Sequence, residues 1–479
     1  MKELIVKKGI IYINGIMVDV DEYLSIEYLE YINLQSKRFE LPKSFFTNEI
    51  FLSLIFNSKL FIYEYILKKE KIEKVIVYDY SLNNIYIRDA TFNLNISFKQ
   101  PIYLDFLLSL REKINNISSL ISFISYLVMT LFFMTYQIFK NHKPLRIDNN
   151  KKFIIVHCKA GLNKIKKYIQ LKGNDFILFI DPSVLPINNN QNCYSTYSLI
   201  SWTDHFEILK SIFKKSYLGF LDLKIVISNN CSSYTSSLML KEFSKRIPHY
   251  IYTKRAMKNI LSFMNDNEFI HTEKESRWGA LCNDLAKSYN KNPIGIPHGL
   301  EYAIKFPLEI FGEKVYCTSV NAERKMKNLY PERNFIYDSK LQEVIYSCNI
   351  NDDTKRKIIF FTEGRNHFKD EEIINQLIKS KIDFYIKLHP LDSLSNYSLE
   401  SSVKFIHDYR SAISNNVCIA RNSSILLEST YNNSIPISII VDSMDKFICD
   451  FLYPSLNHEA ILKIYSVKEL INRLSKNIL

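Results

Sequence analysis

Glycine is scarce in this sequence. The chain has 479 residues and only 10 glycines, roughly a third of average usage. The shortage excludes collagen-like and glycine-linker proteins. It also excludes the glycine-rich phosphate loops, because neither Gly-x-Gly-x-x-Gly nor Gly-x-x-x-x-Gly-Lys-Ser/Thr occurs. If this chain binds a nucleotide, another structural device must hold the phosphates.

Paired cysteines are also missing. The 8 cysteines are widely and irregularly spaced, with no Cys-x-x-Cys pair. This spacing argues against a zinc site or a disulfide framework and favours free thiols in a reducing cytoplasm. The N-terminus lacks the charged start and apolar core of a signal peptide. We therefore expect a cytoplasmic protein.

Acidic residues are outnumbered by basic ones. Lys and Arg total 62 and Asp and Glu total 50, which gives a net charge of +12. A basic surplus suits nucleic acid, an anionic membrane surface or small anionic substrates, and it also follows from a Lys-rich, Ile-rich and Asn-rich composition. The lysines are dispersed, without a basic block, so no nucleic-acid partner is expected. The composition is 47% apolar and 23% charged, which excludes wholesale disorder.

One long segment lacks charge. Residues 114–139 are uncharged, and basic residues flank them on both sides. These roughly 26 residues exceed the about 20 that span a bilayer, although Ser, Thr, Asn and Gln dilute them. Three interpretations stay open: a helix docked on the inner face of the cytoplasmic membrane, a buried core helix, or a true span.

The apolar runs divide the chain into three segments. We expect an N-terminal α/β segment over residues 1–145 that ends in the apolar helix. Residues 150–312 and 313–479 each alternate short β-branched runs with helical patterns, which predicts two doubly wound, Rossmann-like domains of the α/β class. The expected strands of these two domains are 153–158, 176–180, 224–228, 268–271, 293–299, 314–317, 357–362, 384–388, 416–420 and 434–440.

Two polar groups follow predicted strands of the last domain. His389 and Pro390 come after an apolar run that ends in Lys387, and Ser423 and Ser424 follow the next run and open a helix. Ligands of open α/β sheets bind at the carboxyl ends of strands, and a helix start can hold an anion without a glycine-rich loop. Taken singly, a strand-ending turn and simple N-capping explain these residues equally well.

Three further groups follow other strands. Gly364 allows close backbone approach, and Arg365 offers a fork for phosphate or carboxylate; a solvated turn is the alternative. Glu273 and Glu275 follow the 268–271 run, where a carboxylate can act as general base, although a surface ion pair would also account for Glu275. His298 and Gly299 end the 293–299 run and would lie at the same edge.

The order of these motifs resembles that of bacterial GT-B glycosyltransferases of the sialyltransferase and polysialyltransferase type. A His-Pro motif (His389 and Pro390) is followed by a Ser-Ser motif (Ser423 and Ser424) in the C-terminal half. The resemblance covers roughly residues 150–479. It implies two domains facing a cleft, and a CMP-activated nonulosonic sugar whose phosphate these residues hold. It also implies an oligosaccharide or glycolipid acceptor on the N-terminal domain side, near His298 and Gly299.

The sequence departs from that pattern at the general base. The family carries an acidic pair followed by Gly, whereas this chain has Thr362-Glu363-Gly364, with one acidic residue, in the C-terminal half. We therefore expect Glu273 or Glu275 to be the base. The transfer would proceed with inversion, with His389 supporting the leaving phosphate. No metal is expected, because cationic side chains could neutralise the phosphate.

Two other kinds of function remain open at this stage. A Kdo transferase or a glycerol- or ribitol-phosphate transferase of surface polysaccharide synthesis would share the fold and the motifs. A non-catalytic, membrane-associated assembly protein would need the apolar helix but not the polar residues at the strand ends.

Overall fold

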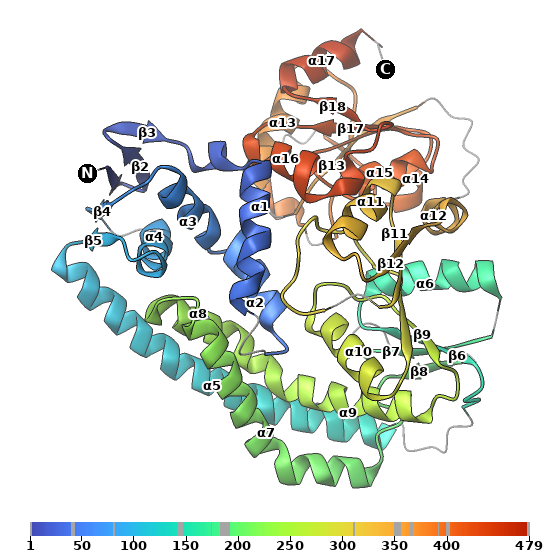
Figure 1. Cartoon of the computed structure of the whole chain (residues 1–479). Helices are drawn as coiled ribbons and strands as arrows, with labels where there is room; N and C mark the ends of the chain where they lie inside the picture. Colours follow the sequence, from blue (N-terminus) through green and yellow to red (C-terminus); the bar gives the residue numbers. More distant parts are fainter. Residues whose placement is uncertain are drawn as a thin grey trace. The chain divides into compact units, whose positions relative to one another are not determined.

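The computed structural model has a mixed α/β fold with three sheets (Figure 1). It forms two compact units. The first comprises Met1–Ile169, Gly173–His298 and Ile304–Val315, and the second comprises Gln170–Lys172, Gly299–Ala303 and Tyr316–Leu479. The structure describes residues 2–39, 44–79, 82–140, 147–173, 175–182, 192–309, 312–348, 356–364, 367–390, 392–398 and 403–476.

The first sheet belongs to the N-terminal segment and has the order β3-β2-β1-β4-β5. Its strands are β1 (Glu3–Lys7), β2 (Ile10–Ile13), β3 (Ile16–Val18), β4 (Lys74–Val77) and β5 (Ser97–Lys99). Two of the ten glycines make its hairpins. Gly9 and Gly15 have φ of +75° and +82°, and each follows a residue that also has positive φ. Such pairs form the tight turns that match the twist of antiparallel strands.

Helices account for most of the rest of this segment. They are α1 (Ile26–Gln35), α2 (Thr47–Phe56), α3 (Leu60–Lys69) and α4 (Leu82–Asn93). In α3 the side chains from Leu60 to Leu67 are all buried. Among them, Glu64 is buried and pairs with Arg38 at 2.8 Å, because a buried carboxylate needs a charged partner.

The second sheet is parallel. Six of its strands follow the order β11-β10-β9-β6-β7-β8, and all of them except the last two residues of β11 belong to the first unit. They are β6 (Lys152–Val156), β7 (Phe176–Ile180), β8 (Cys193–Ser195), β9 (Glu268–His271), β10 (Asn292–Gly295) and β11 (Lys314–Cys317), and the helices α6 (Lys159–Lys172) and α10 (Arg277–Ser288) follow β6 and β9. The chain proceeds outward from β6 on one side and from β9 on the other, so the switch point lies between these two strands.

The strand predicted at residues 224–228 is wrong. These residues end α7 (Trp202–Ser228), a helix of 27 residues. Its buried residues include Ile208, Ile212, Leu223 and Ile227, which recur at helical spacing. A short β-branched run therefore continued an amphipathic helix instead of forming a strand, because burial of one face outweighs the local propensity.

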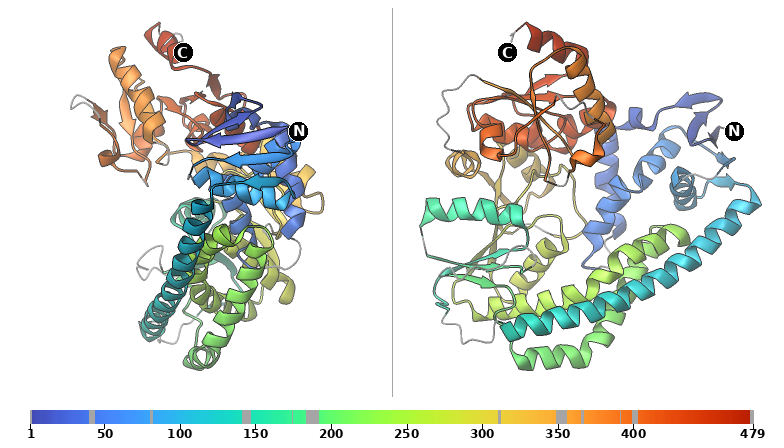
Figure 2. Two further views of the ribbon diagram at one scale, coloured as in Figure 1. Left: turned by 90° about the vertical axis from the view of Figure 1, so that its left-hand side faces the viewer. Right: turned by 180° about the vertical axis from the view of Figure 1, so that it is seen from behind.

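Four helices of the first unit lie together in Figures 1 and 2: α5 (Ile102–Lys140), α7, α8 (Ser233–Phe243) and α9 (Ile247–Phe263). The uncharged segment is the C-terminal two thirds of α5. Leu127, Met134 and Ile138 on its inner face are buried against α7 and α9. Among the described residues, α5 is long and apolar enough to cross a membrane. The helices α2 and α3, which meet at a bend, are long enough to do so only if the two together form one span.

The third sheet is also parallel and has the order β15-β14-β13-β16-β17-β18. Its strands are β13 (Ile358–Phe361), β14 (Tyr385–Lys387), β15 (Lys404–Phe405), β16 (Val417–Ala420), β17 (Ile435–Ile439) and β18 (Leu462–Ile464). The chain proceeds outward from β13 and from β16, so these two strands flank the switch point of this sheet.

The second unit also contains further helices and a strand that is not part of the third sheet. They are α11 (Val320–Leu329), β12 (Asn334–Tyr337), α12 (Ser339–Tyr346), α13 (His367–Lys379), α14 (Tyr409–Ile413), α15 (Ile425–Thr430), α16 (Ser443–Phe447) and α17 (Val467–Ser475). Two parallel sheets covered by helices confirm the α/β class and are consistent with a Rossmann-like layout of both regions.

Candidate functional sites at two sheet edges

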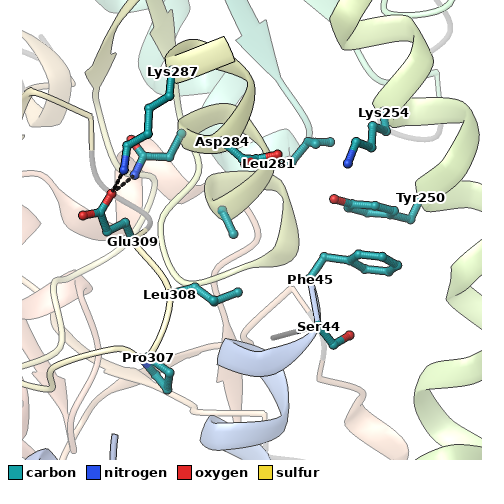
Figure 3. A pocket seen from close by; sticks show the side chains of 12 residues that line it. Ser44, Phe45, Tyr250, Lys254, Leu281, Asp284, Lys287, Pro307, Leu308 and Glu309 are labelled. Carbon is teal, nitrogen blue, oxygen red and sulfur yellow. Dashed lines mark hydrogen bonds and ion pairs between the residues drawn. The ribbon is translucent and has the colours of Figure 1, made fainter. Parts of the chain in front are cut away.

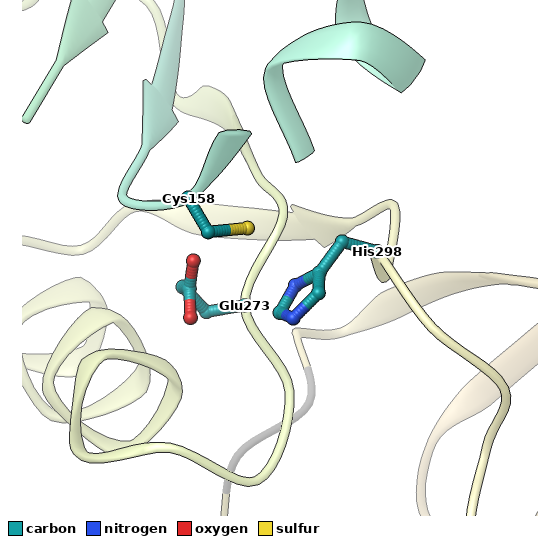
Figure 4. A group of neighbouring side chains, drawn as sticks. All are labelled: Cys158, Glu273 and His298. Carbon is teal, nitrogen blue, oxygen red and sulfur yellow. The ribbon is translucent and has the colours of Figure 1, made fainter. Parts of the chain in front are cut away.

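The switch point of the second sheet collects polar side chains. Cys158 lies just after β6, Glu273 after β9 and His298 after β10. Their ligating atoms Sγ, a carboxylate oxygen and a ring nitrogen all lie within 4.8 Å of one another. Figure 4 shows the three side chains converging from separate loops. Ligands of open parallel sheets bind at this kind of position.

Several buried polar atoms at this edge have no hydrogen-bond partner. They include both ring nitrogens of His157 and of His271, the Thr272 hydroxyl and Oε1 of Glu273. His157 Nδ1 lies 3.6 Å from Asp181, beyond hydrogen-bond distance. Native proteins leave few such atoms unsatisfied, and their concentration at one place favours a ligand site.

Burial sets the charge of the groups around this edge. Burial lowers the pKa of His271 to about 4, so its ring is neutral at physiological pH. Burial lowers the pKa of His249 to about 4 as well. For Cys158, burial and the neighbouring charge of Glu273 raise the thiol pKa to about 12. Cys158 is therefore a thiol here unless a cation replaces its proton.

Glu273 and Glu275 differ in accessibility. Glu273 is 3% exposed and accepts a hydrogen bond from the Ser276 hydroxyl at 2.9 Å. The Glu275 side chain is 20% exposed, and its carboxylate lies 3.3 Å from Nζ of Lys274. Both predicted bases therefore lie on the loop after β9, but Glu275 is the more open one.

Arg277 and Trp278 are the first residues of α10, and their side chains make structural contacts. Arg277 pairs with Glu49 at 2.8 Å, and its guanidinium lies 4.4 Å from the Trp278 ring centroid. Trp278 is 7% exposed and packs in the core cluster under the sheet. It is stacked near His157, with ring centroids 5.0 Å apart. The indole therefore fixes the position of His157.

A separate pocket of about 810 Å³ lies beside α10 (Figure 3). Phe45 and Tyr250 stack at its wall with centroids 3.6 Å apart, and Lys287 pairs with Glu309 across it. None of the site residues predicted from the sequence lines this pocket. The Phe45 and Tyr250 rings stack on each other there.

The second site lies at the switch point of the third sheet. The His389 backbone N–H donates to the Thr362 hydroxyl at 3.0 Å. Gly364 has φ +73°, and a Cβ at this position would lie 3.0 Å from His389 Nδ1. The loops after β13 and β14 therefore pack closely because residue 364 is glycine, and Gly364 and His389 lie next to each other.

Beneath these loops lies a buried ionic cluster that the motifs did not predict. Arg421 is 2% exposed, and its guanidinium lies 2.6 Å from Asp445, 3.2 Å from Glu363 and 3.7 Å from Asp370. Three carboxylates share one cation. Burial, the largest cause, raises the pKa of Glu363 to about 7 and that of Asp370 to about 6.

The Ser-Ser motif begins a short helix. Ser424 is the N-cap of α15, makes no side-chain capping bond, and donates to Glu428 at 3.0 Å. The Ser423 hydroxyl accepts a long bond of 3.4 Å from the backbone N–H of Ile425. The two serines follow Arg421 at the same sheet edge, so their backbone N–H groups lie at the switch point.

The other predicted residues have simpler surroundings. Nζ of Lys387 donates to the Leu388 carbonyl at 3.3 Å, and Pro390 is exposed in a turn. Gly299 is half-buried in the second unit, in the segment Gly299–Ala303. Arg365 lies outside the described residues.

Sequence reasoning missed Cys158 and Arg421. Both stand directly after or close to the end of a strand, so applying the strand-end rule to every residue type would have found them. No protein-family model matches the chain, and no curated protein is similar to it in sequence.

Proposed function

We propose that this protein is an inverting glycosyltransferase of GT-B type that uses a CMP-activated, sialic-acid-like donor. One observation carries the proposal: His389 packs against Gly364 beside the switch point of a parallel sheet, where Ser423 and Ser424 begin the next helix. That arrangement supports a phosphate-binding role, and it needs no glycine-rich loop.

The donor phosphate would be held by His389, Lys387 and the backbone N–H groups at the start of α15. Arg421 contributes little directly, because its charge is shared among three buried carboxylates. The raised pKa of Glu363, about 7, favours binding, since a partly protonated Glu363 repels a phosphate less. Arg421 is then a positioning residue for the loops that meet the donor.

The acceptor would be a glycan hydroxyl activated in the first unit. Glu275 is the better general base, because a fifth of its side chain is exposed whereas Glu273 is buried. A base must reach the hydroxyl whose proton it takes. The sugar would then be attacked from the face opposite CMP, and His389 would stabilise the departing phosphate.

The experiment that tests this function is donor turnover. Purified protein is offered CMP-sialic acid, CMP-Kdo and CDP-glycerol, and release of the nucleotide is measured with and without a glycan acceptor. Turnover of CMP-sialic acid is expected. Turnover of CMP-Kdo or CDP-glycerol instead would replace the donor with the corresponding alternative. A folded protein inert toward all three would favour a non-catalytic assembly role.

We also propose that α5 docks on the anionic inner face of the cytoplasmic membrane. Its outer face is apolar: Ile121 is 59% exposed and Phe132 is 75% exposed. The net charge of +12 complements anionic lipid, and a surface helix of this kind binds by apolar burial plus charge attraction. The inner face of α5 packs on the rest of the first unit. This packing favours a helix that lies on the membrane surface over one that crosses the membrane.

Vesicle flotation tests the docking of α5. The wild-type protein is expected to float with vesicles containing phosphatidylglycerol. It should float less with neutral phosphatidylcholine vesicles, because the charge term is lost. Ile121→Glu together with Phe132→Glu should abolish flotation. Phe368→Glu, at an 81% exposed residue of α13, is the control and should float like the wild type. Equal flotation of both variants would contradict the proposal.

A further inference from the structure

We propose that Cys158, Glu273 and His298 form a binding site for one zinc ion, with a fourth position open to water or to an oxygen of a substrate. This site goes beyond the proposed transfer, because zinc binding can be measured without the donor or the acceptor. It also adds a metal that the sequence did not predict, because the three ligands come from separate strand ends.

The distances suit a small tetrahedral ion. The three ligating atoms all lie within 4.8 Å of one another. Zinc bonds of about 2.0–2.3 Å at tetrahedral angles place two ligands roughly 3.6 Å apart. Each ligand therefore needs to approach its neighbours by about 1 Å at most, which side-chain rotation supplies without a change of fold.

Each ligand is already oriented by a neighbour. The geometry places His298 Nδ1 2.8 Å from the Thr272 carbonyl, and an N–H donated there leaves Nε2 as the lone-pair nitrogen. The Ser276 hydroxyl binds Oε2 of Glu273 and leaves Oε1 without a partner. Metal sites rely on such supporting contacts to fix the ligand orientation.

The backbone at Cys158 is shaped for close approach. Cys158 caps α6, and its sulfur accepts from the Gly161 N–H at 3.2 Å. A Cβ at position 161 would lie 2.4 Å from the Thr272 hydroxyl and 3.2 Å from the Cys158 sulfur. Glycine at this position therefore lets the loops after β6 and β9 come together.

The charge of Glu273 also calls for a cation. Its side chain is 3% exposed, and the neighbouring ammonium of Lys274 faces Glu275 at 3.3 Å. A buried carboxylate oxygen without a partner is costly. A divalent ion between Glu273 and Cys158 would neutralise the carboxylate and take the place of the thiol proton, which passes to water. The set of thiolate, imidazole and carboxylate favours zinc over magnesium or calcium, which prefer oxygen alone.

The test is the metal content of the full chain. Protein stripped with a chelator, incubated with a slight excess of zinc and then dialysed against metal-free buffer should retain one ion per chain, measured by elemental analysis. Cobalt substitution should give a thiolate-to-metal charge-transfer band. Cys158→Ser and His298→Gln should each lower zinc affinity at least tenfold and remove or shift that band. Cys193→Ser, at a half-buried free cysteine in β8, is the matched control and should bind like the wild type.

Two outcomes would overturn the inference. One is a folded wild-type protein, checked by circular dichroism, that retains no stoichiometric zinc. The other is zinc retained equally by the Cys158→Ser, His298→Gln and Cys193→Ser proteins. Using two ligand variants keeps the test decisive if one of them fails to fold.

Discussion

Arg421→Ala is expected to destabilise the second unit by about 3–5 kcal/mol, the usual cost of removing one partner from a buried ion pair. The guanidinium is buried among Asp445, Glu363 and Asp370. Without it, three carboxylates remain buried and uncompensated. The free energy of unfolding, measured by urea denaturation, should fall by that amount.

The pH dependence of this loss follows from the raised pKa values. In the folded wild type, burial raises the pKa of Glu363 to about 7 and of Asp370 to about 6. The folded state therefore binds protons more strongly than the unfolded state, and these two groups lower stability as pH rises from about 4 through 7. The penalty of Arg421→Ala should be largest near pH 8 and smaller near pH 5, where protonated carboxyls need no cation.

The matched control is Arg473→Ala on α17. Arg473 pairs with Glu469 at 2.8 Å, and both side chains are more than a third exposed. Exposed pairs of this kind are worth less than about 1 kcal/mol. If Arg421→Ala and Arg473→Ala unfold at the same urea concentration, the buried cluster does not stabilise this unit.

His389→Ala should weaken binding of the CMP donor roughly ten- to hundredfold, the loss of one charge-assisted hydrogen bond to phosphate. His389 lies at the sheet edge against Gly364. The hydrogen bond to the Thr362 hydroxyl comes from the backbone N–H of residue 389, so removal of the ring keeps this contact between the loops. Calorimetric titration of CMP measures the change, and unfolding curves confirm that the variant is folded.

His407→Ala is the control for this binding experiment, because His407 is exposed in the same unit. It should bind CMP like the wild type. If the wild type binds CMP clearly and His389→Ala binds it equally well, His389 does not contact the donor. The phosphate would then be bound at the helix start near Ser423 and Ser424.

Much of the fold could be predicted from sequence because the strands are short, apolar and separated by helices. The runs at 176–180 and 268–271 coincide with β7 and β9. The run at 224–228 failed because its β-branched residues continue the buried face of α7. Local composition does not distinguish those cases; only the pattern over the preceding twenty residues does.

The candidate sites were only partly predictable. Glu273, His298 and His389 were found because they directly follow strands. Cys158 was missed because wide cysteine spacing argues against metal in sequence, whereas the sheet brings distant strand ends together. Arg421 was missed because a buried arginine and an exposed one look alike until its partners Asp370 and Asp445 are placed around it.

The central claim is that the chain transfers a sugar from a CMP donor, and nucleotide release tests it most directly. With CMP-sialic acid as the substrate, the wild type is expected to release CMP. His389→Ala should do so far more slowly, whereas Glu275→Gln should bind the donor but fail to transfer to an acceptor. A folded wild-type protein that releases no nucleotide from CMP-sialic acid or from CMP-Kdo would contradict the claim.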